Sequence, residues 1–562
     1  MNDSPNVKDI VLVGGGHTHA LLIRMWAMNP TPGLRLTLIS PNVHTPYSGM
    51  LPGFIAGHYS FDQIHIDLHK VCAWAGVRFI QAQATAIDTR AQAIKLSIRP
   101  AIEYDICSID IGSTPNKKIP GSEAFAVPVK PISEFAQHWL ALKQQLLHNN
   151  NAAPLKVAMI GGGAGGVEII TAMQYWSKQN TCNAEFCLIS RGKSLLEGYP
   201  KPLQKKLLHH LQTNDIHYKL NFDTQAIDQS HIVSDTDRHA YDKVFYCTQA
   251  SAANWLRSSD LALTENGFIQ VNDQLQSLRH ANIFAAGDIS HQVKHPSPKA
   301  GVYAVRMAPT LFNNIIHLAL NKPLQAFKPQ KNFLSLLALG EKTALGSRRF
   351  FSFGGKWVWR LKDKIDSQFM NQFHKLPAIN MGENEKSRNK HNETALLHPN
   401  LQKQLGIQDA HELNMRCGGC GGKIGASVIT KVLKELSTYH QADILIGLNS
   451  SDDAAVLNIP NDKKLVQTID HLKTLIDDPY LFGKLSALHA LSDIFAMNAQ
   501  PHSAQALVQL PLASEHIQRR DMSQLMQGAL EVLNQHKCTL VGGHTSEDSQ
   551  LHLGFCINAL AN

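Results

Sequence analysis

The stretch DIVLVGGGHTHALLIRMW, residues 9–26, decides the fold of the first part of the chain. Its apolar run from Ile10 to Val13 predicts a buried strand, the glycines after it predict a tight turn, and the apolar periodicity that follows predicts a helix. Gly14 and Gly16 occupy the first two positions of a dinucleotide-binding loop, in which backbone N–H groups approach a pyrophosphate at a helix N-terminus. The stretch therefore predicts a nucleotide-binding α/β unit.

Two positions depart from this pattern. His19 stands where the third glycine of the loop is expected, and the next strand, LRLTLIS at residues 34–40, ends in Ser40 instead of an acidic residue. An acidic residue there would bind the ribose of the nucleotide. A purely structural glycine turn therefore remains open for this loop taken alone.

The same arrangement recurs in LKVAMIGGGAGGVEIITAM, residues 155–173. The second loop and its helix carry Gly161, Gly163, Gly166 and Glu168. Two copies predict one nucleotide-binding fold inserted within another. The strand that follows ends in Ser190 and Arg191, a hydroxyl and a guanidinium that can accept the 2′-phosphate of NADPH. If Arg191 is only a solvated loop charge, NADH is the alternative.

A third element is HANIFAAGDIS, residues 280–290, followed by PKAGVYAVRMAPTLFNNI at 298–315. With both loops, these stretches resemble the two-dinucleotide flavoprotein family, close to type II NADH dehydrogenases and sulfide:quinone oxidoreductases, from residue 8 to about residue 370. The resemblance implies FAD and NAD(P)H as cofactors. It also implies that Asp288 binds the ribityl chain of FAD, and that the helix after Lys299, Ala300 and Gly301 points its N-terminus at the flavin ring.

The positions of the cysteines limit which kind of electron acceptor the enzyme can use. Disulfide reductases of that family carry a cysteine pair after the first loop, whereas here residues 40–60 contain none and Cys72 stands alone. We therefore expect a direct acceptor, such as a quinone or a small oxidant. The stretch RRFFSFGGKWVWRLKDKIDSQFM, residues 348–370, mixes aromatic and basic side chains. It predicts either a helix packed on its own domain or an amphipathic segment on a membrane surface.

Composition limits the class of protein. The chain has 562 residues, of which 44% are hydrophobic and 17% charged, with a formal net charge of +8. Basic residues are scattered, so we expect no nucleic-acid partner. No run reaches the roughly 18 apolar residues of a spanning helix, and the N-terminus has no signal core. Nine sparse cysteines favour a reducing compartment. We expect a cytoplasmic enzyme, with peripheral attachment to the inner face of the membrane as an alternative.

The second part of the chain contains RCGGCGGKIG, residues 416–425, after a polar stretch at 380–400 that predicts a linker. The motif can be half of a zinc site, a structural glycine loop, or a reactive thiol beside a phosphate-binding lysine. A zinc site needs two further ligands, but Cys538 and Cys556 are distant and unpaired in sequence. Apolar residues at helical spacing after Lys423 predict that the loop precedes a helix.

Carboxylates downstream favour the third reading. NSSDDAAVL, residues 449–457, places Asp452 and Asp453 before a strand, LVQTIDHL at 465–472 ends a strand in Asp470, and Asp493 lies in an apolar helix. Such groups are costly to bury unless they bind cations. Mg²⁺ with nucleotide phosphates would supply the charge. LVGGHTSED, residues 540–548, predicts a glycine turn with hydroxyl and imidazole groups.

The motifs CGGK, SSDDAAV, TIDHLKTLIDDPYLFGKLSALHALSDIFAM and VGGHT resemble, in this order, the N-terminal half of selenophosphate synthetase (selenide, water dikinase), over about residues 410–562. The resemblance implies that Cys420 is the selenium-handling thiol, that Lys423 contacts phosphate, and that Asp453 and Asp493 bind magnesium. The implied ATP contacts are Ser450, Ser451, Asp452, Asp470, Gly542, Gly543 and His544. Cys417 is extra to the motif and can pair with Cys420 when oxidised.

The expected fold is α/β. Residues 1–380 form nested FAD and NAD(P) domains, with the NAD(P) subdomain at about 150–270. A linker at 381–405 precedes an ATP-binding α+β domain of the aminoimidazole ribonucleotide synthetase type at 406–562. We expect an FAD-dependent NAD(P)H oxidoreductase fused to a selenophosphate synthetase module. The family's second half, with another magnesium-binding aspartate, is not in this sequence, so the expectation is either a separate chain that supplies it or a weakly active copy.

Two other functions remain open from the sequence. One is a type II NADH:quinone reductase with a catalytically inert tail. In the other, the tail is a dimerisation or ATP-sensing module, because related ATP-binding halves form dimers. The small-molecule partners expected are NAD(P)H, ATP, and selenide or another selenium species.

Overall fold

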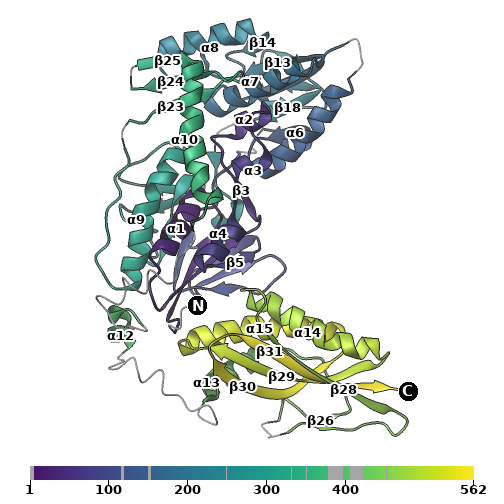
Figure 1. The fold of residues 1–562 in the computed structure, drawn as a ribbon. Helices are drawn as coiled ribbons and strands as arrows, with labels where there is room; N and C mark the ends of the chain where they lie inside the picture. Colours follow the sequence, from purple (N-terminus) through teal and green to yellow (C-terminus); the bar gives the residue numbers. More distant parts are fainter. Residues whose placement is uncertain are drawn as a thin grey trace.

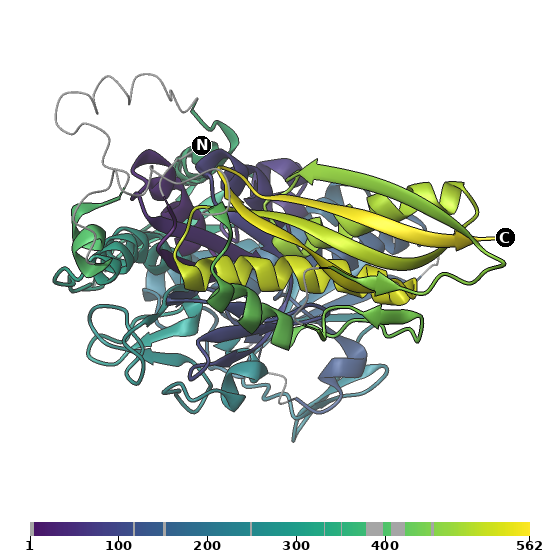
Figure 2. The same ribbon diagram turned by 90° about the horizontal axis from the view of Figure 1, so that it is seen from below.

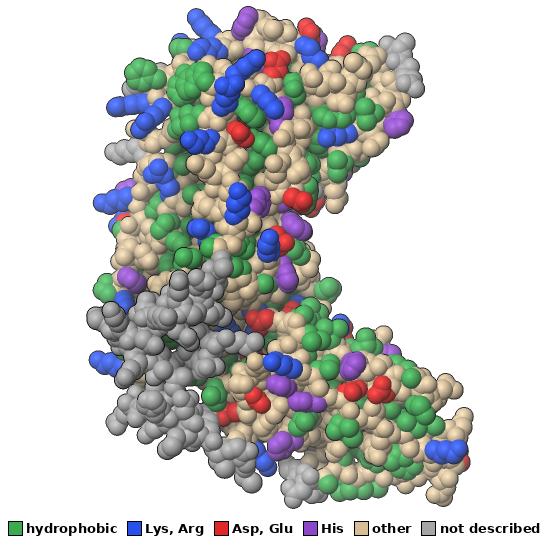
Figure 3. All heavy atoms as spheres, viewed as in Figure 1, with side chains coloured by type: hydrophobic (Ala, Val, Ile, Leu, Met, Phe, Trp, Pro, Cys, Tyr) green, Lys and Arg blue, Asp and Glu red, His purple; other side chains and the backbone are tan. Residues whose placement is uncertain are grey.

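The computed structural model describes residues 5–115, 119–149, 153–247, 250–330, 332–349, 351–377, 397–405, 422–450 and 454–562. Two parallel sheets form the N-terminal part, residues 5–377, and a mixed sheet with two long helices forms the C-terminal part, residues 422–562 (Figure 1). The molecule is concave on the side where the two parts diverge (Figure 3). Within the described residues, no helix is long and apolar enough to span a membrane.

The first sheet contains five parallel strands in the order β21-β9-β1-β2-β5. They are β21 (Ile283–Ala285), β9 (Ile106–Ile109), β1 (Lys8–Val13), β2 (Leu34–Ser40) and β5 (Arg78–Gln81). The helices α1 (His17–Met28), α4 (Leu68–Ala75) and α9 (Gly301–Ala319) pack on it. β1 is almost entirely buried, as a parallel strand covered on both faces requires.

The second sheet is also five-stranded and parallel, in the order β11-β18-β12-β13-β14. Its strands are β11 (Ala126–Pro128), β18 (Lys243–Tyr246), β12 (Leu155–Ile160), β13 (Ala184–Ile189) and β14 (Ile216–Lys219), with α6 (Ile132–Leu147), α7 (Ala164–Gln179) and α8 (Lys201–Thr213). The chain completes this sheet before β21 and α9 return to the first one. The predicted insertion of one nucleotide-binding fold within the other is confirmed.

Smaller elements surround these sheets. They are β3 (His44–Pro46) with β4 (His65–Asp67), β6 (Ala84–Asp88) with β7 (Ala93–Leu96) and β8 (Ile102–Glu103), β15 (Ala226–Ile227) with β16 (His231–Val233) and β17 (Arg238–Ala240), β10 (Thr114–Pro115) with β19 (Ala250–Ser251), β20 (Ile269–Val271) with β22 (Ser290–Gln292), and the short helices α2 (Leu51–Ile55), α3 (Phe61–Ile64) and α5 (Ser122–Phe125).

The aromatic and basic stretch at 348–370 forms a strand and a helix. β25 (Phe351–Gly355) closes an antiparallel sheet with β23 (Ser335–Ala338) and β24 (Ala344–Arg348), and α10 (Lys356–His374) runs from it along the N-terminal part (Figure 1). One face of α10 is buried and includes an ion pair between Lys362 and Asp366, 2.6 Å apart. The structure thus has the helix packed on its own domain, while Phe351 and Trp357 remain 77% and 56% exposed.

The C-terminal part is a four-stranded sheet in the order β28-β31-β29-β30, covered on one face by α14 (Pro479–Ala496) and α15 (Glu515–Gln535). Its strands are β28 (Lys464–Lys473), β31 (His552–Ala561), β29 (Gln500–Pro511) and β30 (Thr539–Asp548). Figure 2 shows these strands side by side from below. The predicted helix after Lys423 is α13 (Ala426–Glu435), and β26 (Ile444–Ile446) pairs with β27 (Val456–Leu457). A short helix, α12 (Pro399–Leu405), falls inside the predicted linker.

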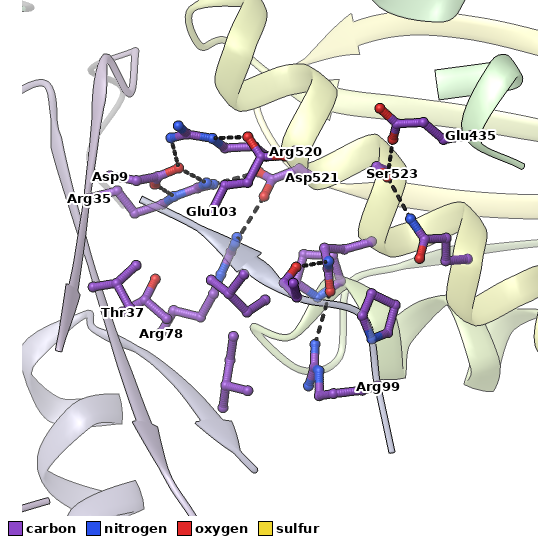
Figure 4. Close-up of a pocket in the computed structure, with 18 residues that line it drawn as sticks. Asp9, Arg35, Thr37, Arg78, Arg99, Glu103, Glu435, Arg520, Asp521 and Ser523 are labelled. Carbon is purple, nitrogen blue, oxygen red and sulfur yellow. Dashed lines mark hydrogen bonds and ion pairs between the residues drawn. The ribbon is translucent and has the colours of Figure 1, made fainter. Parts of the chain in front are cut away.

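The two parts meet through α15 and the first sheet (Figure 4). Arg520 donates to Asp9 at 3.0 Å and to Asp105 at 3.1 Å, while Asp521 accepts from Arg35 at 2.5 Å and from Arg78 at 2.9 Å. All of these side chains except Asp105 line a cavity of about 260 Å³. Burial alone would raise the pKa of Asp521, but the two guanidinium groups lower it to about 2. The interface is therefore a buried network of alternating charges.

Candidate functional site

The first glycine loop joins β1 to α1, as predicted. The Gly14 N–H donates to the carbonyl of Ile39 at 2.8 Å, and the Gly16 N–H donates to the carbonyl of Asp110 at 3.1 Å. A Cβ on Gly14, whose φ is +96°, would lie 2.4 Å from that same Asp110 carbonyl oxygen. His19, at the expected third glycine, is buried and bonds to the Gly14 carbonyl and the Ser108 hydroxyl. A polar side chain thus supports the loop where a glycine was expected.

Asp288 lies in a polar cluster at the end of β21. Its carboxylate accepts from Ser113 at 3.1 Å and from the Lys130 ammonium at 2.9 Å. Although burial opposes ionisation, Lys130 and Ser113 hold the pKa of Asp288 below its usual value. Lys299 donates to the carbonyl of Ser290, and burial lowers its pKa to about 8. Ala300 and Gly301 begin α9 beside this cluster.

His17 opens α1 next to these charges. Burial lowers the pKa of His17 to about 4, so the ring is neutral at physiological pH. Its Nε2 is buried and has no hydrogen-bond partner among the described residues. An orphaned ring nitrogen beside Asp288 and a glycine loop fits a polar ligand such as the phosphate and ribityl groups of FAD. The residues present are therefore compatible with FAD.

The second glycine loop borders a cavity of about 600 Å³. Its lining includes Gly161, Gly163, Ser190, Arg191, Glu197 and Cys247. A Cβ on Gly163 would meet nothing within 4 Å, so the space beside this glycine is open. Arg191 and the Glu197 carboxylate line the same cavity. A guanidinium suits the 2′-phosphate of NADPH and a carboxylate suits the ribose hydroxyl of NADH, so the lining does not favour one over the other. The chemistry of this lining is compatible with a nicotinamide dinucleotide.

Gly166 and Glu168 do not line that cavity within the part of the chain that is described. A Cβ on Gly166 would lie 2.0 Å from the carbonyl oxygen of Gly161, so this glycine serves helix–strand packing. The Glu168 carboxylate accepts from the backbone N–H of Ala338 at 2.8 Å. Burial raises the pKa of Glu168 to about 7, although Lys362 acts in the opposite direction.

Two predicted residues of the C-terminal part, Asp470 and Asp493, lie on β28 and α14. Thr468 on β28 donates to the Asp493 carboxylate on α14 at 2.8 Å. Asp470 lies two residues further along β28, and its Oδ2 is buried without a partner among the described residues. A buried carboxylate oxygen without a donor is costly, and a cation or a bound ligand would satisfy it. Asp470 is thus compatible with a bound cation or ligand, whereas Asp493 is exposed and already bonded to Thr468.

Two local predictions for this part are wrong. Asp470 does not end its strand, because β28 pairs with β31 as far as Lys473. Gly542, Gly543 and His544 do not form a turn but lie within β30, which pairs with β29. A Cβ on Gly543 would lie 2.0 Å from the Ala506 carbonyl oxygen, so close strand approach explains this glycine. β30 is the edge opposite β28, so His544 is separated from Asp470 by the width of the sheet.

The remaining predicted residues are exposed or lie outside the described ranges. Lys423 and Ser450 are exposed. Cys417, Cys420, Ser451, Asp452 and Asp453 lie outside the described residues. In the described ranges, no group of three or more His, Cys, Asp or Glu side chains has a metal-binding arrangement.

Residues 8–308 match the family described as pyridine nucleotide-disulphide oxidoreductase. This match covers more than half of the chain. The chain belongs to the pyridine nucleotide-disulphide oxidoreductase family. The membership confirms the predicted oxidoreductase fold and the prediction of an enzyme. A second match, AIR synthase related protein, N-terminal domain, covers residues 451–561 and confirms the predicted C-terminal fold.

Curated relatives match the C-terminal part of this oxidoreductase. A selenide, water dikinase of Desulfitobacterium hafniense (strain Y51) is 37% identical over 145 residues, which are 26% of this chain and 42% of that protein. One of Pelobacter propionicus is 37% identical over 139 residues, 25% of this chain and 39% of that protein. The chain thus spans about two fifths of the length of these relatives.

Solved structures match the N-terminal part. The sulfide:quinone oxidoreductase of Aquifex aeolicus aligns with a TM-score of 0.57 and 19% identity, over 69% of this chain and 96% of that one. NDH2 of Plasmodium falciparum aligns with a TM-score of 0.54 and 15% identity, over 65% of this chain and 98% of that one. At these identities the likeness shows the fold, and it agrees with the predicted nesting of two nucleotide-binding domains.

Sequence reasoning missed three polar residues of the first site: Asp110, Ser113 and Lys130. Asp110 and Ser113 lie in YDICSIDIGSTP, residues 104–115, and an acidic residue directly after an apolar strand was a signal that could have been used. Lys130 offered no such signal, because it reaches Asp288 across 158 positions of sequence.

Proposed function

We propose that the chain is an FAD-dependent NAD(P)H oxidoreductase fused to an ATP- and Mg²⁺-binding selenide, water dikinase module. The observation that carries the proposal is the presence in one chain of residues 8–308, which belong to the oxidoreductase family, and residues 451–561, which match the AIR synthase-related domain. The 37% identity to a selenide, water dikinase over 145 residues supports selenium as the substrate class of the C-terminal part. We propose a cytoplasmic location for this enzyme.

In the first part, bound FAD would take a hydride from NAD(P)H and pass the electrons to an acceptor. The chain's own residues hold the two nucleotides. Asp288, fixed by Lys130 and Ser113, offers a carboxylate to the ribityl hydroxyl groups. Gly161 and Gly163, with Arg191, Ser190 and Glu197, line the cavity for NAD(P)H.

In the second part, Cys420 would be the thiol that delivers reduced selenium to a phosphoryl group of ATP. Lys423 and magnesium, held by Asp453 and Asp493, would stabilise the charge that develops on the phosphate. Ser450, Ser451, Asp452, Asp470, Gly542, Gly543 and His544 would contact ATP. The link between the parts, in this proposal, is that the oxidoreductase reduces a selenium species and so supplies selenide to the dikinase module.

Partner chains belong to the same proposal. Another chain would supply the second half of the dikinase. A homodimer is supported by exposed apolar side chains of the C-terminal part, among them Ile469 at 71% and Leu488 at 49% exposed.

The second candidate function is a type II NADH:quinone reductase whose C-terminal part is catalytically inert. Two observations favour it: the fold likeness to NDH2, and the exposed Phe351 and Trp357 at the start of α10. Lys and Arg side chains gather at this end of the molecule (Figure 3). In this second candidate function they would contact an anionic membrane surface. Quinone would then be the acceptor.

Two assays on the purified chain separate these functions. Selenide-dependent release of phosphate from ATP, measured with and without an added C-terminal half of a selenide, water dikinase, supports the fusion enzyme. NAD(P)H oxidation that requires quinone, with no phosphate release under any of these conditions, supports the second candidate.

The cysteines give a sharper test of the dikinase module. Cys420→Ser should abolish selenide-dependent turnover, because a hydroxyl is a far poorer nucleophile than a thiolate near neutral pH. Cys417→Ser is the matched control and should reduce turnover only weakly. A zinc site predicts instead that both variants lose bound metal and stability alike. Alkylation rates of the two thiols, with Cys420 reacting first, provide a second readout.

A further inference from the structure

Asp110 is the residue around which the first nucleotide site is built. It follows β9 directly, and its carboxylate accepts from the backbone N–H groups of Thr18 at 3.0 Å and His19 at 3.2 Å. These N–H groups belong to the first turn of α1. The N-terminus of α1, which carries the positive end of the helix dipole, is therefore already occupied by a carboxylate of the protein itself.

Two glycines make room for this side chain. A Cβ on Gly16 would lie 2.3 Å from the carboxyl carbon of Asp110, and a Cβ on Gly287 would lie 2.3 Å from its Oδ1. Glycine at these two positions, on two separate loops, is thus required by the Asp110 carboxyl group. In a usual dinucleotide loop, the space beside the second glycine lets the pyrophosphate approach. Here the same space contains a carboxyl group.

Among the described residues, no Lys or Arg side chain forms an ion pair with Asp110. The titratable groups packed near it are His17 and His19 on α1, both neutral because burial lowers the pKa of each to about 4. Asp288, on the turn at 287–289, is negative, and its ammonium partner is Lys130. Burial and, to a smaller extent, the Asp288 charge raise the pKa of Asp110 to about 7, although the hydrogen bonds from His19 and Thr18 act in the opposite direction.

We propose that Asp110 is a positioning residue of the FAD site and takes up a proton when the FAD diphosphate binds at the N-terminus of α1. This inference rests on the proposed function, since it requires FAD. A diphosphate placed on the same helix end would lie close to an ionised Asp110 in a buried environment, where like charges repel strongly. A protonated carboxyl group removes the repulsion, can donate to a phosphate oxygen, and still accepts the two N–H groups of α1.

The expected result is a pH-dependent affinity for FAD. If one proton is bound with each FAD, the dissociation constant rises about tenfold per pH unit above neutral pH and is constant below pH 6 or so. Asp110→Asn, which is neutral at all pH values, should bind FAD with a flat profile between pH 6 and 8.5. Asp242→Asn is the matched control: Asp242 also accepts a backbone N–H, from Lys156, but is exposed in the second domain, so the slope should persist.

The measurement is equilibrium binding of FAD to the full chain freed of nucleotide, followed by FAD fluorescence and calibrated with free FAD at each pH. Calorimetry at pH 8.5 in two buffers of different ionisation enthalpy counts protons taken up by the wild type, so the test does not depend on the Asp110→Asn variant folding. Uptake of one proton supports the proposal. FAD binding without proton uptake, or an unchanged slope in Asp110→Asn, overturns it. A chain that binds no FAD at any pH overturns the proposed function and this inference with it.

Discussion

The guanidinium of Arg99 and the carboxylate of Asp478 form a two-point ion pair between the two parts of the chain, with Nη1–Oδ2 and Nη2–Oδ1 distances of 2.5 and 2.9 Å. Both side chains are only 5% exposed. Asp478 is also the N-cap of α14 and accepts from the backbone N–H of Tyr480 at 3.1 Å. A residue of the oxidoreductase part therefore stabilises the start of the helix that carries Asp493.

We expect Arg99→Ala to destabilise this helix end. Removing one partner of a buried ion pair leaves the other charge buried and typically costs about 3–5 kcal/mol. Hydrogen exchange at the Tyr480 and Leu481 amides measures the loss as a lower free energy of opening. Arg238→Ala, which breaks the exposed pair with Asp228, is the control and should cost less than about 1 kcal/mol. If the two substitutions lowered the free energy by equal amounts, the Arg99–Asp478 pair would not be buried at the interface.

Acid should weaken the contact between the two parts. The folded pKa of Asp521 is about 2, below the ordinary value of 3.8, because Arg35 and Arg78 favour the ionised form. A carboxyl group whose pKa is lower in the folded than in the unfolded chain stabilises the fold at every pH above the unfolded pKa. This stability is lost as the pH falls from about 4 towards 2. Small-angle scattering should then show an increased radius of gyration. Asp521→Asn should be less stable at pH 7 and lose less on acidification; a wild type that stays compact down to pH 2 would refute the prediction.

Asp288→Ala should lose FAD. Hydrogen bonds from hydroxyl groups to a carboxylate contribute about 1.5–3 kcal/mol each, so losing one lowers FAD affinity by about 10- to 100-fold. The measurement is the visible flavin absorption of the purified variant. A variant that retains full flavin would show that Asp288 pairs only with Lys130 and Ser113.

Gly163→Val should weaken binding of NAD(P)H and leave FAD bound. A Cβ at this position meets no atom within 4 Å, so the fold tolerates the side chain, which projects into the space that a pyrophosphate needs. The expected readout is a raised KM for NAD(P)H with an unchanged flavin spectrum. Loss of FAD with normal NAD(P)H kinetics would reverse the assignment of the two sites.

The strand–loop–helix units around Gly14 and Gly161 could be predicted from the sequence because their determinants are local. Buried parallel strands are apolar throughout, and glycines mark the loops between strand and helix. The two predictions that failed in the C-terminal part depended on pairing with distant strands. Gly542 and Gly543 suggest a turn when read alone, and only their pairing with β29 shows that they belong to a strand.

The polar residues of the first site were harder to predict for the same physical reason. Asp110 contacts Thr18 across 92 positions and Lys130 contacts Asp288 across 158 positions, so no periodicity links them. Gly16 was predicted to leave space for a pyrophosphate beside the loop. What fills that space is a carboxyl group 94 positions later, which no local pattern reveals.

The two ends of β1 lie next to different parts of the molecule. This arrangement determines how selenide would pass from one proposed active site to the other. Asp9, near the amino end, bonds to Arg520 of the C-terminal part, whereas Gly14, directly after the carboxyl end, begins the first glycine loop. About 17 Å of extended strand separates these positions. Under the proposed function, selenide made at the flavin is released at the carboxyl end of the strands, opposite the end that contacts the C-terminal part. It then reaches the dikinase by diffusion. A soluble selenide scavenger would therefore compete with the dikinase for the released selenide. The fusion would raise the local concentration of selenide but would not protect it from the solvent.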